Sequence, residues 1–346
     1  MNRALSYDDV LLVPQYSNIH SRSEIDIGAD LGKSLKLSLP IIASPMDTIT
    51  STNMSRAMSI AGGTGVIHRY NTPRTQSEQI AQFYAQEEPE TKRNNVIGAA
   101  IGVNGDYMDR AQQLFDAGTR FFCVDVAHGH HVMVKDALQE LRRQFGDFVH
   151  IMAGNVATLQ GVNDLSDWGA DSVRCNIGGG SICSTRIQTG HGLPGLQTIF
   201  ECAKTDRDVK IIADGGIKNS GDMVKALAAG ADAVMVGSLL SGTDETPGPL
   251  QRSPDGTQWK SYRGMASKEA QVEWRGKYSS FEGVATRVPY RGPVAAVLED
   301  IERGIRSGLS YSGARTITEL QAKAQFVRQT TSGLSESRTH ILSRSW

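Results

Sequence analysis

Ser172-Val-Arg-Cys-Asn-Ile-Gly-Gly-Gly-Ser-Ile-Cys-Ser-Thr-Arg186 joins a short strand-like run to a glycine-rich loop that carries a single thiol. The three consecutive glycines, Gly178 to Gly180, let the backbone turn sharply and bring its N–H and C=O groups close to an ion. Cys183 follows at once, and a thiol near oriented N–H groups or positive charge is a nucleophile. The alternative is a glycine-rich turn that carries an incidental cysteine.

Short β-rich runs recur along the chain, and each is followed by a polar loop and a helix-like stretch. The runs are Leu39–Ala43, Thr64–Ile67, Val96–Ile101, Phe121–Val124, Val149–Met152, Ser172–Cys175, Val209–Ala213 and Ala233–Val236. Largely apolar strands that alternate with helices predict a parallel sheet buried on both faces. Eight such units predict a closed (β/α)₈ TIM barrel, with residues 1–346 as a single domain. A doubly wound open sheet is the alternative, but the chain lacks a GxGxxG turn after its first strand, and two or more units would be left over.

Helical periodicity and good helix formers between these runs predict helices at Asp109–Asp116, Val132–Phe145 and Ser220–Ala229. The 346 residues carry a formal charge of −1 and no Lys/Arg run, so nothing indicates a nucleic-acid or anionic-membrane partner. The N-terminus has no apolar signal-peptide core and no apolar run approaches the length of a membrane span, which predicts a cytoplasmic protein.

The four cysteines, Cys123, Cys175, Cys183 and Cys202, show neither a CxxC pair nor a His/Cys metal spacing, so we expect no zinc site and no disulfide framework. Cys123 and Cys175 lie in strand-like runs and are expected in the core.

The unusual polar residues fall just after the predicted strands, where TIM barrels build their active sites. They are Ser44-Pro-Met-Asp-Thr48, His68-Arg-Tyr70, Asp125-Val-Ala-His-Gly-His130, Gly154-Asn155, the Cys183 loop, Asp214-Gly-Gly216 and Gly237-Ser238. Small residues after the seventh and eighth strands favour a phosphate bound by backbone N–H groups, and so a phosphorylated ligand. Singly, His68 or His128 could be a structural histidine, and Asp125 a helix cap.

After the eighth strand, residues 243–289 are polar, rich in Gly and Ser, and poor in apolar periodicity. Asp255-Gly256 predicts a hairpin turn. Because long structureless loops are uncommon inside a barrel, we expect this region to act as a flap or lid. Helical patterning returns from Gly292 to Ala324, and residues 330–346 form a polar C-terminal tail.

Four motifs together resemble the IMP dehydrogenase/GMP reductase family. They are Gly-Gly-Ser-Ile-Cys-Ser-Thr-Arg186, Asp214-Gly-Gly216, Met235-Val-Gly-Ser238 and Tyr262-Arg-Gly-Met265. The resemblance runs from Leu5 to Arg328, so it covers nearly the whole chain. It implies a TIM barrel, assembled as a homotetramer, that binds a purine nucleoside monophosphate (GMP or IMP) and a nicotinamide dinucleotide.

The resemblance also implies a role for each matching residue. Cys183 is the nucleophile that attacks purine C2, with Thr185 and Glu282 as catalytic partners. The substrate-binding residues are Ser181, Gly216, Gly237, Ser238 and Tyr262 for the phosphate, Asp214 for the ribose, and Gly264 and Met265, with Glu282, for the base. The residues expected beside the dinucleotide are Asp125, Ala127, His128, Asn155 and Tyr278. Backbone carbonyls of Gly178, Gly180 and Cys183 are expected around a monovalent cation, K⁺.

Two activities fit this family. No insert of about 100 residues separates the early strands, so the paired regulatory CBS modules that most of the dehydrogenases carry are expected to be absent. The segment between Met265 and Glu282 is short, has no Arg-Tyr pair and resembles the reductase flap, which implies reduction of GMP to IMP by NADPH. Ser44-Pro-Met-Asp-Thr48 and Leu334-Ser-Glu-Ser-Arg338 resemble the dehydrogenase, so oxidation of IMP with NAD stays open.

The chain departs from both patterns at Asn176, Gly178 and Ser184, and Arg69 replaces the catalytic Lys of many reductases. A nucleotide-binding barrel without catalysis is a further alternative, but such a protein needs no nucleophile.

Overall fold

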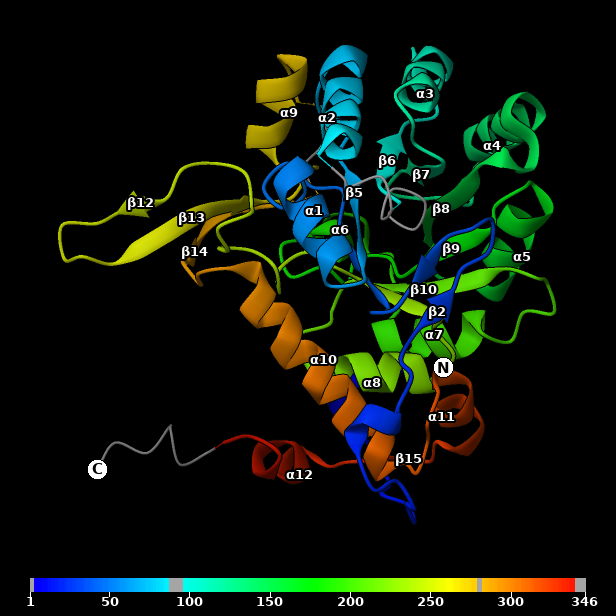
Figure 1. Cartoon of the computed structure of the whole chain (residues 1–346), viewed down its shortest axis with the longest axis vertical. Coiled ribbons are helices and arrows are strands. Elements are labelled where there is room, and N and C mark those ends of the chain that lie inside the picture. Colours follow the sequence, from blue (N-terminus) through cyan, green and yellow to red (C-terminus); the bar gives the residue numbers. More distant parts are fainter. Residues whose placement is uncertain (1–2, 87–95, 279–281, 340–346) are drawn as a thin grey trace.

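The computed structural model describes residues 3–86, 96–278 and 282–339. Its centre is a closed barrel of eight parallel strands (Figure 1), which confirms the predicted TIM barrel. In chain order the strands are β4 (Ile41–Ala43), β5 (Thr64–Ile67), β6 (Gly98–Ile101), β7 (Phe121–Asp125), β8 (His150–Val156), β9 (Ser172–Cys175), β10 (Lys210–Asp214) and β11 (Ala233–Val236). Each overlaps a predicted run, and β8 is the one that extends furthest beyond it.

Helices connect the strands on the outside of the barrel. They are α1 (Thr52–Ile60), α2 (Pro73–Ala85), α3 (Tyr107–Asp116), α4 (Val132–Phe145), α5 (Leu159–Asp167), α6 (Thr185–Thr189), α7 (Gly195–Cys202) and α8 (Ser220–Ala228), followed after β11 by α10 (Val294–Tyr311) and α11 (Ile317–Lys323). Short 3₁₀ turns lie at Tyr7–Asp9, Arg22–Glu24 and Gly146–Phe148. Among the described residues, no helix combines the length and apolar character needed to cross a bilayer.

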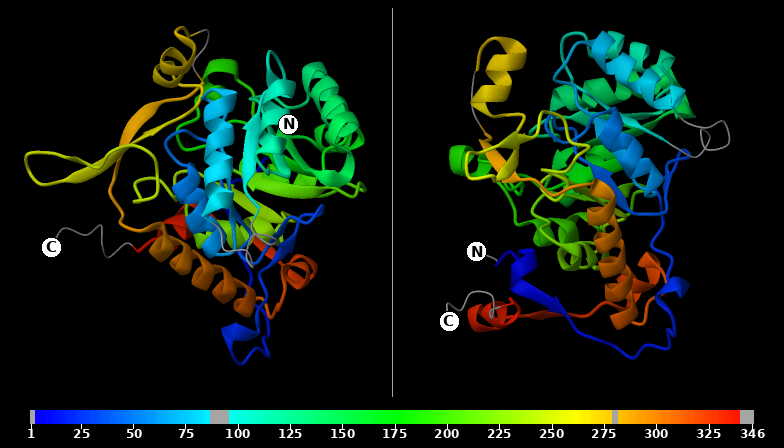
Figure 2. Two further views of the ribbon diagram at one scale, coloured as in Figure 1. Left: turned by 45° about the horizontal axis from the view of Figure 1, so that its top comes forward. Right: turned by 60° about the vertical axis from the view of Figure 1, so that its left-hand side comes forward.

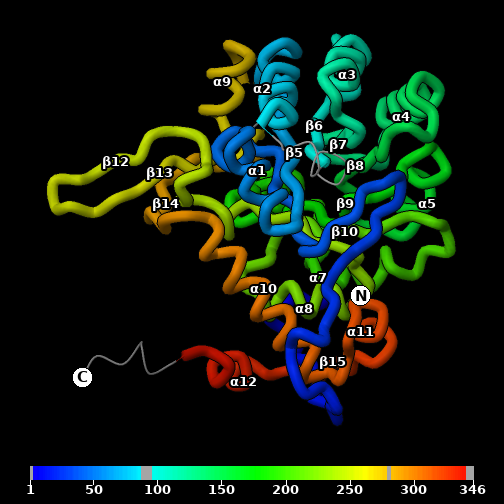
Figure 3. The backbone as a smooth tube through the Cα atoms, viewed as in Figure 1, coloured from blue at the N-terminus to red at the C-terminus, as the bar shows by residue number. Residues whose placement is uncertain are grey.

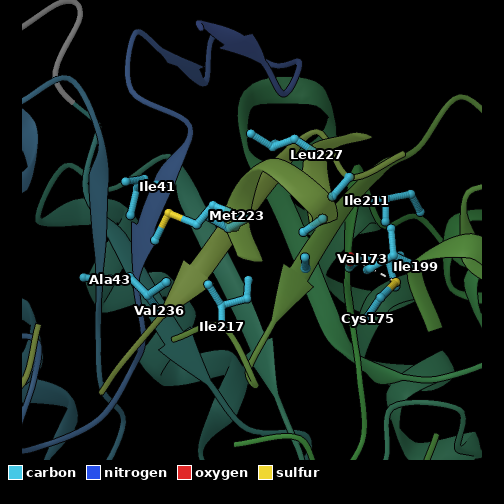
Figure 4. Close-up of a cluster of buried hydrophobic side chains, with 14 of the residues drawn as sticks. Ile41, Ala43, Val173, Cys175, Ile199, Ile211, Ile217, Met223, Leu227 and Val236 are labelled. Atoms are coloured by element: carbon cyan, nitrogen blue, oxygen red, sulfur yellow. Dashed lines mark hydrogen bonds between the residues drawn. The ribbon is translucent and has the colours of Figure 1, made fainter. Parts of the chain in front are cut away.

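Successive side chains along each strand point alternately toward the helices and into the lumen, so the core has two layers. Ile41, Ala43, Phe122 and Val124 belong to the outer layer between strands and helices, while their neighbours in the strands face the lumen. Figure 4 shows part of the outer layer, with labelled side chains from β4, β9, β10, β11, α7 and α8. Both Cys123 and Cys175 are fully buried, as predicted. Burial raises the pKa of the Cys123 thiol to about 12, so it stays unreactive.

A short hairpin closes the amino-terminal end of the lumen. Its strands, β2 (Ala29–Asp30) and β3 (Lys36–Leu37), carry Leu31, Leu35 and Leu37 into the lumen cluster. A second antiparallel pair is formed by β1 (Val10–Leu12) and β15 (Phe326–Arg328), which brings residues near the start of the chain beside residues near its end; Figure 3 shows β15 beside the blue N-terminal part of the tube. The candidate site lies at the opposite end of the barrel, at the carboxyl ends of the strands.

Residues 243–289 contain more regular structure than their composition indicates. A three-stranded antiparallel sheet is formed by β12 (Gln251–Arg252), β13 (Gln258–Arg263) and β14 (Ala285–Pro289), and α9 (Lys268–Arg275) lies between the last two. The predicted turn at Asp255-Gly256 joins β12 to β13, and this hairpin projects from the barrel (Figure 2). β14 is largely exposed and β12 is only two residues long, so neither carries an apolar alternation that would mark it in the sequence.

The polar tail contains one short helix, α12 (Thr331–Glu336), and lies apart from the barrel in Figure 1. Residues 340–346 of the predicted tail and residues 279–281 of the predicted flap lie outside the described residues.

His150, at the start of β8, gives the fold a testable pH dependence. Its Nε2 lies 2.7 Å from Ser172 Oγ, its ring meets Phe121 edge-on at 5.3 Å, and burial lowers its pKa to about 4. An unfolded chain binds this proton below a pH of about 6.5, whereas the folded protein excludes it until about 4. The free energy of unfolding therefore falls as pH drops through this window, by at most about 1.4 kcal/mol per pH unit for one group.

We expect His150→Gln, which keeps a donor near Ser172, to make this pH dependence shallower. Urea unfolding between about pH 7 and about pH 5 measures the difference from the parent protein. Equal slopes for the two proteins would contradict the assignment.

Candidate active site

A cavity of about 280 Å³ opens at the carboxyl ends of the barrel strands. Of the predicted site residues, its lining includes Cys183, Thr185, Glu282, Ser181, Asp214, Gly216, Gly237, Ser238, Tyr262, Gly264, Met265, Asp125, Ala127, Asn155, Gly178 and Gly180. His128 and Tyr278 do not line it, and both are exposed. Segments that follow seven of the eight barrel strands thus converge on one cavity, together with part of the flap region, because all parallel strands end on the same side of the barrel.

The glycine loop after β9 is shaped by close backbone approach. Gly178 has φ 76°, and a Cβ there would lie 2.5 Å from Arg186 Cγ. A Cβ on Gly179 would lie 2.0 Å from Asn176 Nδ2. Larger residues would therefore displace Arg186 and Asn176, whose side chains bond to Ile177 O and Gly215 O respectively.

Cys183 begins a chain of three polar groups. Its Sγ donates to Thr185 Oγ1 at 3.2 Å, and Thr185 Oγ1 donates to Glu282 Oε2 at 2.7 Å. The Glu282 backbone is fixed on both sides, because its O accepts from Ser184 N at 2.9 Å and its N–H donates to Ala266 O at 3.1 Å. A thiol, a hydroxyl and a carboxylate in this order can move a proton between the sulfur and the carboxylate.

Hydroxyl groups and the start of a helical turn also line the cavity. Ser181 Oγ lies 3.4 Å from Tyr262 OH. After β11, the N–H groups of Leu240 and Ser241 donate to Gly237 O, so the first N–H groups of this turn are not used within it. Donors of this kind suit an anion such as a phosphate.

Arg174 ties two carboxylates together inside the barrel. Its Nη1 donates to Asp125 Oδ1 at 2.7 Å, and its Nε and Nη2 donate to Asp214 Oδ2 at 3.0 and 2.9 Å. Asn155 Nδ2 donates to the same Asp214 oxygen at 2.8 Å. Burial by itself would lower the pKa of Arg174, but Asp214, Cys123 and Asp125 raise it well above its ordinary value, so the guanidinium stays charged.

Arg69 provides a second fixed charge at the rim. Its Nε donates to Asp125 O at 3.2 Å, and its guanidinium lies over the Tyr70 ring at 5.2 Å. A guanidinium keeps its proton, so Arg69 can orient or neutralise a ligand but not supply a proton.

One of the backbone carbonyls proposed to bind the cation already accepts a hydrogen bond within the glycine loop. The Gly180 carbonyl accepts the Cys183 N–H at 3.1 Å and closes a turn. Among the described residues, no group of three or more His, Cys, Asp or Glu side chains could hold a metal ion. The K⁺ site stays a prediction.

Sequence reasoning missed Arg174, although it lines the cavity. The available signal was a charged residue inside a barrel strand, where both faces are buried. Met46 and Tyr70 also line the cavity, and both lie in polar segments that the sequence had placed after strands.

Comparisons with known proteins agree with this geometry. The family model described as the IMP dehydrogenase / GMP reductase domain matches residues 4–340. The chain is 32% identical to inosine-5'-monophosphate dehydrogenase of Nitrosopumilus maritimus over 467 aligned positions, covering 97% of this chain and 98% of the relative. It is 31% identical to GMP reductase of Leishmania major over 479 positions, covering 98% and 97%.

A solved structure shares the fold throughout. The crystal structure of a Cys-to-Ala variant of GMP reductase from Trypanosoma brucei, in complex with guanosine 5'-monophosphate, matches with a TM-score of 0.90 at 29% identity and covers 98% of each chain. The alignments of 467 and 479 positions are longer than the 346 residues of this chain, so those two relatives carry residues with no counterpart here.

Arg174 yields a stability prediction. Arg174→Met would leave Asp125 and Asp214 buried without their shared cation, and removing one partner of such a buried pair typically costs about 3–5 kcal/mol. Arg143→Met, on an exposed turn of α4, is the matched control and should change stability by less than about 0.5 kcal/mol. Urea unfolding at neutral pH measures both, and an equal effect of the two substitutions would refute the structural role of Arg174.

Proposed function

The chain belongs to the IMP dehydrogenase/GMP reductase family, and we propose that within it the protein is a GMP reductase. Members of this family are oxidoreductases that act on purine nucleotides with a nicotinamide cofactor. The proposed reaction converts GMP and NADPH to IMP and ammonia through a covalent bond between Cys183 and purine C2.

The positions of the side chains support a definite orientation of GMP. Ser181, Tyr262 and the turn at Gly237 would hold the phosphate, and Asp214 the ribose hydroxyls. The base would then lie between Cys183 and the segment Gly264–Met265, which faces the same cavity. The dinucleotide would lie against Asp125, Ala127 and Asn155, on the side of the cavity formed by β7 and β8.

The thiol relay fits the first chemical step. Cys183 adds to C2 as a thiolate, and its proton passes through Thr185 to Glu282. The protonated carboxyl group can then return a proton to the departing amino group, which leaves as ammonia rather than amide. The cofactor supplies hydride to C2 when bound. The C2–S bond then breaks, and Cys183 is released for the next cycle.

One observation carries the choice of direction. Three carboxylates line the described cavity, and two of them, Asp125 and Asp214, are bonded to Arg174. Glu282 has no ion-pair partner among the described residues, so it is the carboxylate free to exchange a proton with Thr185. Reductive release of ammonia needs this one acid/base group, whereas hydrolysis of the covalent intermediate also needs a group that activates water.

The alternative is an IMP dehydrogenase. It is favoured by Ser44-Pro-Met-Asp47, whose residues Ser44, Pro45 and Met46 line the cavity. Chain length does not separate the two activities, because the Leishmania reductase also aligns over more positions than this chain has residues. The homotetramer, the bound K⁺ and the cytoplasmic location are part of the proposal.

Steady-state assays with the purified chain test the direction. We expect repeated turnover of GMP with NADPH, and with IMP and NAD at most one hydride transfer per site, followed by a trapped Cys183 adduct. Cys183→Ala should abolish turnover but retain GMP binding, in line with the GMP-bound Cys-to-Ala relative. Multiple turnovers to XMP, at a rate comparable with GMP reduction, would show that the dehydrogenase is correct.

Glu282→Gln tests the relay separately. Gln keeps the size of the side chain and a hydrogen bond to Thr185, but it cannot carry the proton. We expect the rate of ammonia release to fall by about 10²–10⁴, the usual range for general acid–base catalysis, while the Kd for GMP changes little. Rapid-quench measurement of ammonia gives the rate, and equal losses in rate and affinity would indicate a binding role only.

A further inference from the structure

Asp47, in the loop after β4, receives hydrogen bonds from two parts of the flap region. Arg263, at the end of β13, donates through Nε to Asp47 Oδ2 at 3.0 Å and also through Nη2. Trp274 Nε1, on α9, donates to the same oxygen at 2.9 Å. The Asp47 side chain is only 5% exposed, so these contacts lie largely away from water, where charge-assisted hydrogen bonds are strongest.

The last three residues of α9 all contact the barrel rim or β13. Glu273 Oε2 accepts from Arg263 Nη1 at 2.6 Å, Trp274 reaches Asp47, and the Arg275 guanidinium lies 5.7 Å from the Tyr70 ring centre. Only Ala270 and Gln271 of this helix are buried. Figures 1 and 2 show the helix projecting away from the barrel strands. Side-chain contacts at its C-terminal end therefore carry much of its attachment.

The backbone of Asp47 and the hydroxyl of its neighbour Thr48 also contact the segment expected to bind the purine, which begins at the arginine that the Asp47 carboxylate holds. Asp47 N–H lies 3.2 Å from Met265 Sδ, and Arg263 N–H donates to Thr48 Oγ1 at 3.2 Å. Gly264 and Met265, which line the cavity, directly follow Arg263. Displacement of Asp47 would therefore disturb both the position of α9 and the position of Gly264 and Met265 in the cavity wall.

His68, a titratable ring beside Trp274, does not compete with Arg263 for Asp47. The His68 ring lies 6.2 Å from the Trp274 ring, and burial lowers its pKa to about 4, with Arg263 and Arg110 acting in the same direction against Asp47. His68 is therefore neutral at physiological pH, and Arg263 is the cation that balances Asp47.

We propose that Asp47 is a positioning residue that docks α9, as a lid helix, on the barrel and holds Arg263–Met265 in place at the same time. Docking of the lid helix and placement of the base-binding segment then depend on one buried carboxylate. The inference rests on the proposed function only for its effect on turnover, since the docking contacts exist without any ligand. Neither Asp47 nor Trp274 lines the cavity, so their effect on chemistry is indirect.

Trp274→Phe removes the single indole N–H donor and keeps an aromatic ring in place. Trp259→Phe is the matched control, because Trp259 lies on β13, paired with β12 and β14, and packs on Arg287 at 4.1 Å. The first measurement is hydrogen exchange of residues 268–275 in the ligand-free protein, followed by mass spectrometry. We expect exchange in the lid helix to be about 10-fold faster or more in Trp274→Phe and unchanged in the control.

The second measurement is steady-state kinetics with GMP and NADPH. We expect kcat to fall about 10-fold in Trp274→Phe with less than about a threefold change in the KM for GMP. Asp47→Asn, which also releases Arg263, should change kcat and KM together. A merely structural role would instead lower the unfolding midpoint and leave the kinetics of the folded fraction unchanged.

The two measurements separate the possible failures. If the lid helix exchanges equally in Trp274→Phe and Trp259→Phe, the docking role of Asp47 is wrong, whatever reaction the protein catalyses. If exchange quickens but neither variant alters turnover of the protein's substrate, docking without positioning is established and the proposal is overturned. If the protein instead oxidises IMP, the exchange result is unaffected and the kinetics are repeated in that direction.

Discussion

A single buried guanidinium organises the interior of the site. Arg174 points from β9 toward Asp125 on β7 and Asp214 on β10, so it bridges strands on both sides of its own. Two carboxylates this deep in a barrel would repel each other and lose solvation without a shared cation. Asn155 on β8 completes the set by donating to Asp214. Four neighbouring strands thus have their carboxyl ends held in one hydrogen-bonded arrangement before any ligand arrives.

The glycine loop depends on that arrangement. It leaves β9 after Cys175, one residue beyond Arg174, and Asn176 Nδ2 donates to Gly215 O next to Asp214. The loop therefore starts from a fixed point and reaches Cys183 through glycines that tolerate close contact with Asn176 and Arg186. A reactive thiol needs a reproducible position relative to its target, because small displacements are costly to catalysis.

Much of this could be predicted from sequence because periodicity and strand-end chemistry are local. The eight strand runs, and helix α4 at Val132–Phe145, were found from pattern alone. Arg174 was missed because the run Ser172–Cys175 was assigned to a buried strand, and pattern analysis does not show which charged partners will face it across the barrel. Strands β12 and β14 were not predicted because they have no buried face, and a strand without a buried face shows no apolar alternation in its sequence.

Two of the five residues expected beside the dinucleotide differ from the others in position. His128 and Tyr278 are exposed and lie outside the cavity lining, whereas Asp125, Ala127 and Asn155 line it, and the contact of all five with the dinucleotide stays a prediction. Side chains beyond the ends of strands are set by loop conformation, which the sequence pattern specifies weakly. Residues within one or two positions of a strand end are constrained by the barrel itself.

Charge is distributed around the cavity so that one carboxylate is left chemically available. Asp125 and Asp214 share Arg174, and Asp47, just outside the lining, is bound by Arg263. An arginine cannot take up or release a proton, so we assign these three carboxylates to positioning rather than to proton transfer. Glu282 is bonded to a hydroxyl instead, and that hydroxyl accepts from the thiol of Cys183. Proton transfer is therefore expected at Glu282, which is connected through Thr185 to the nucleophile Cys183.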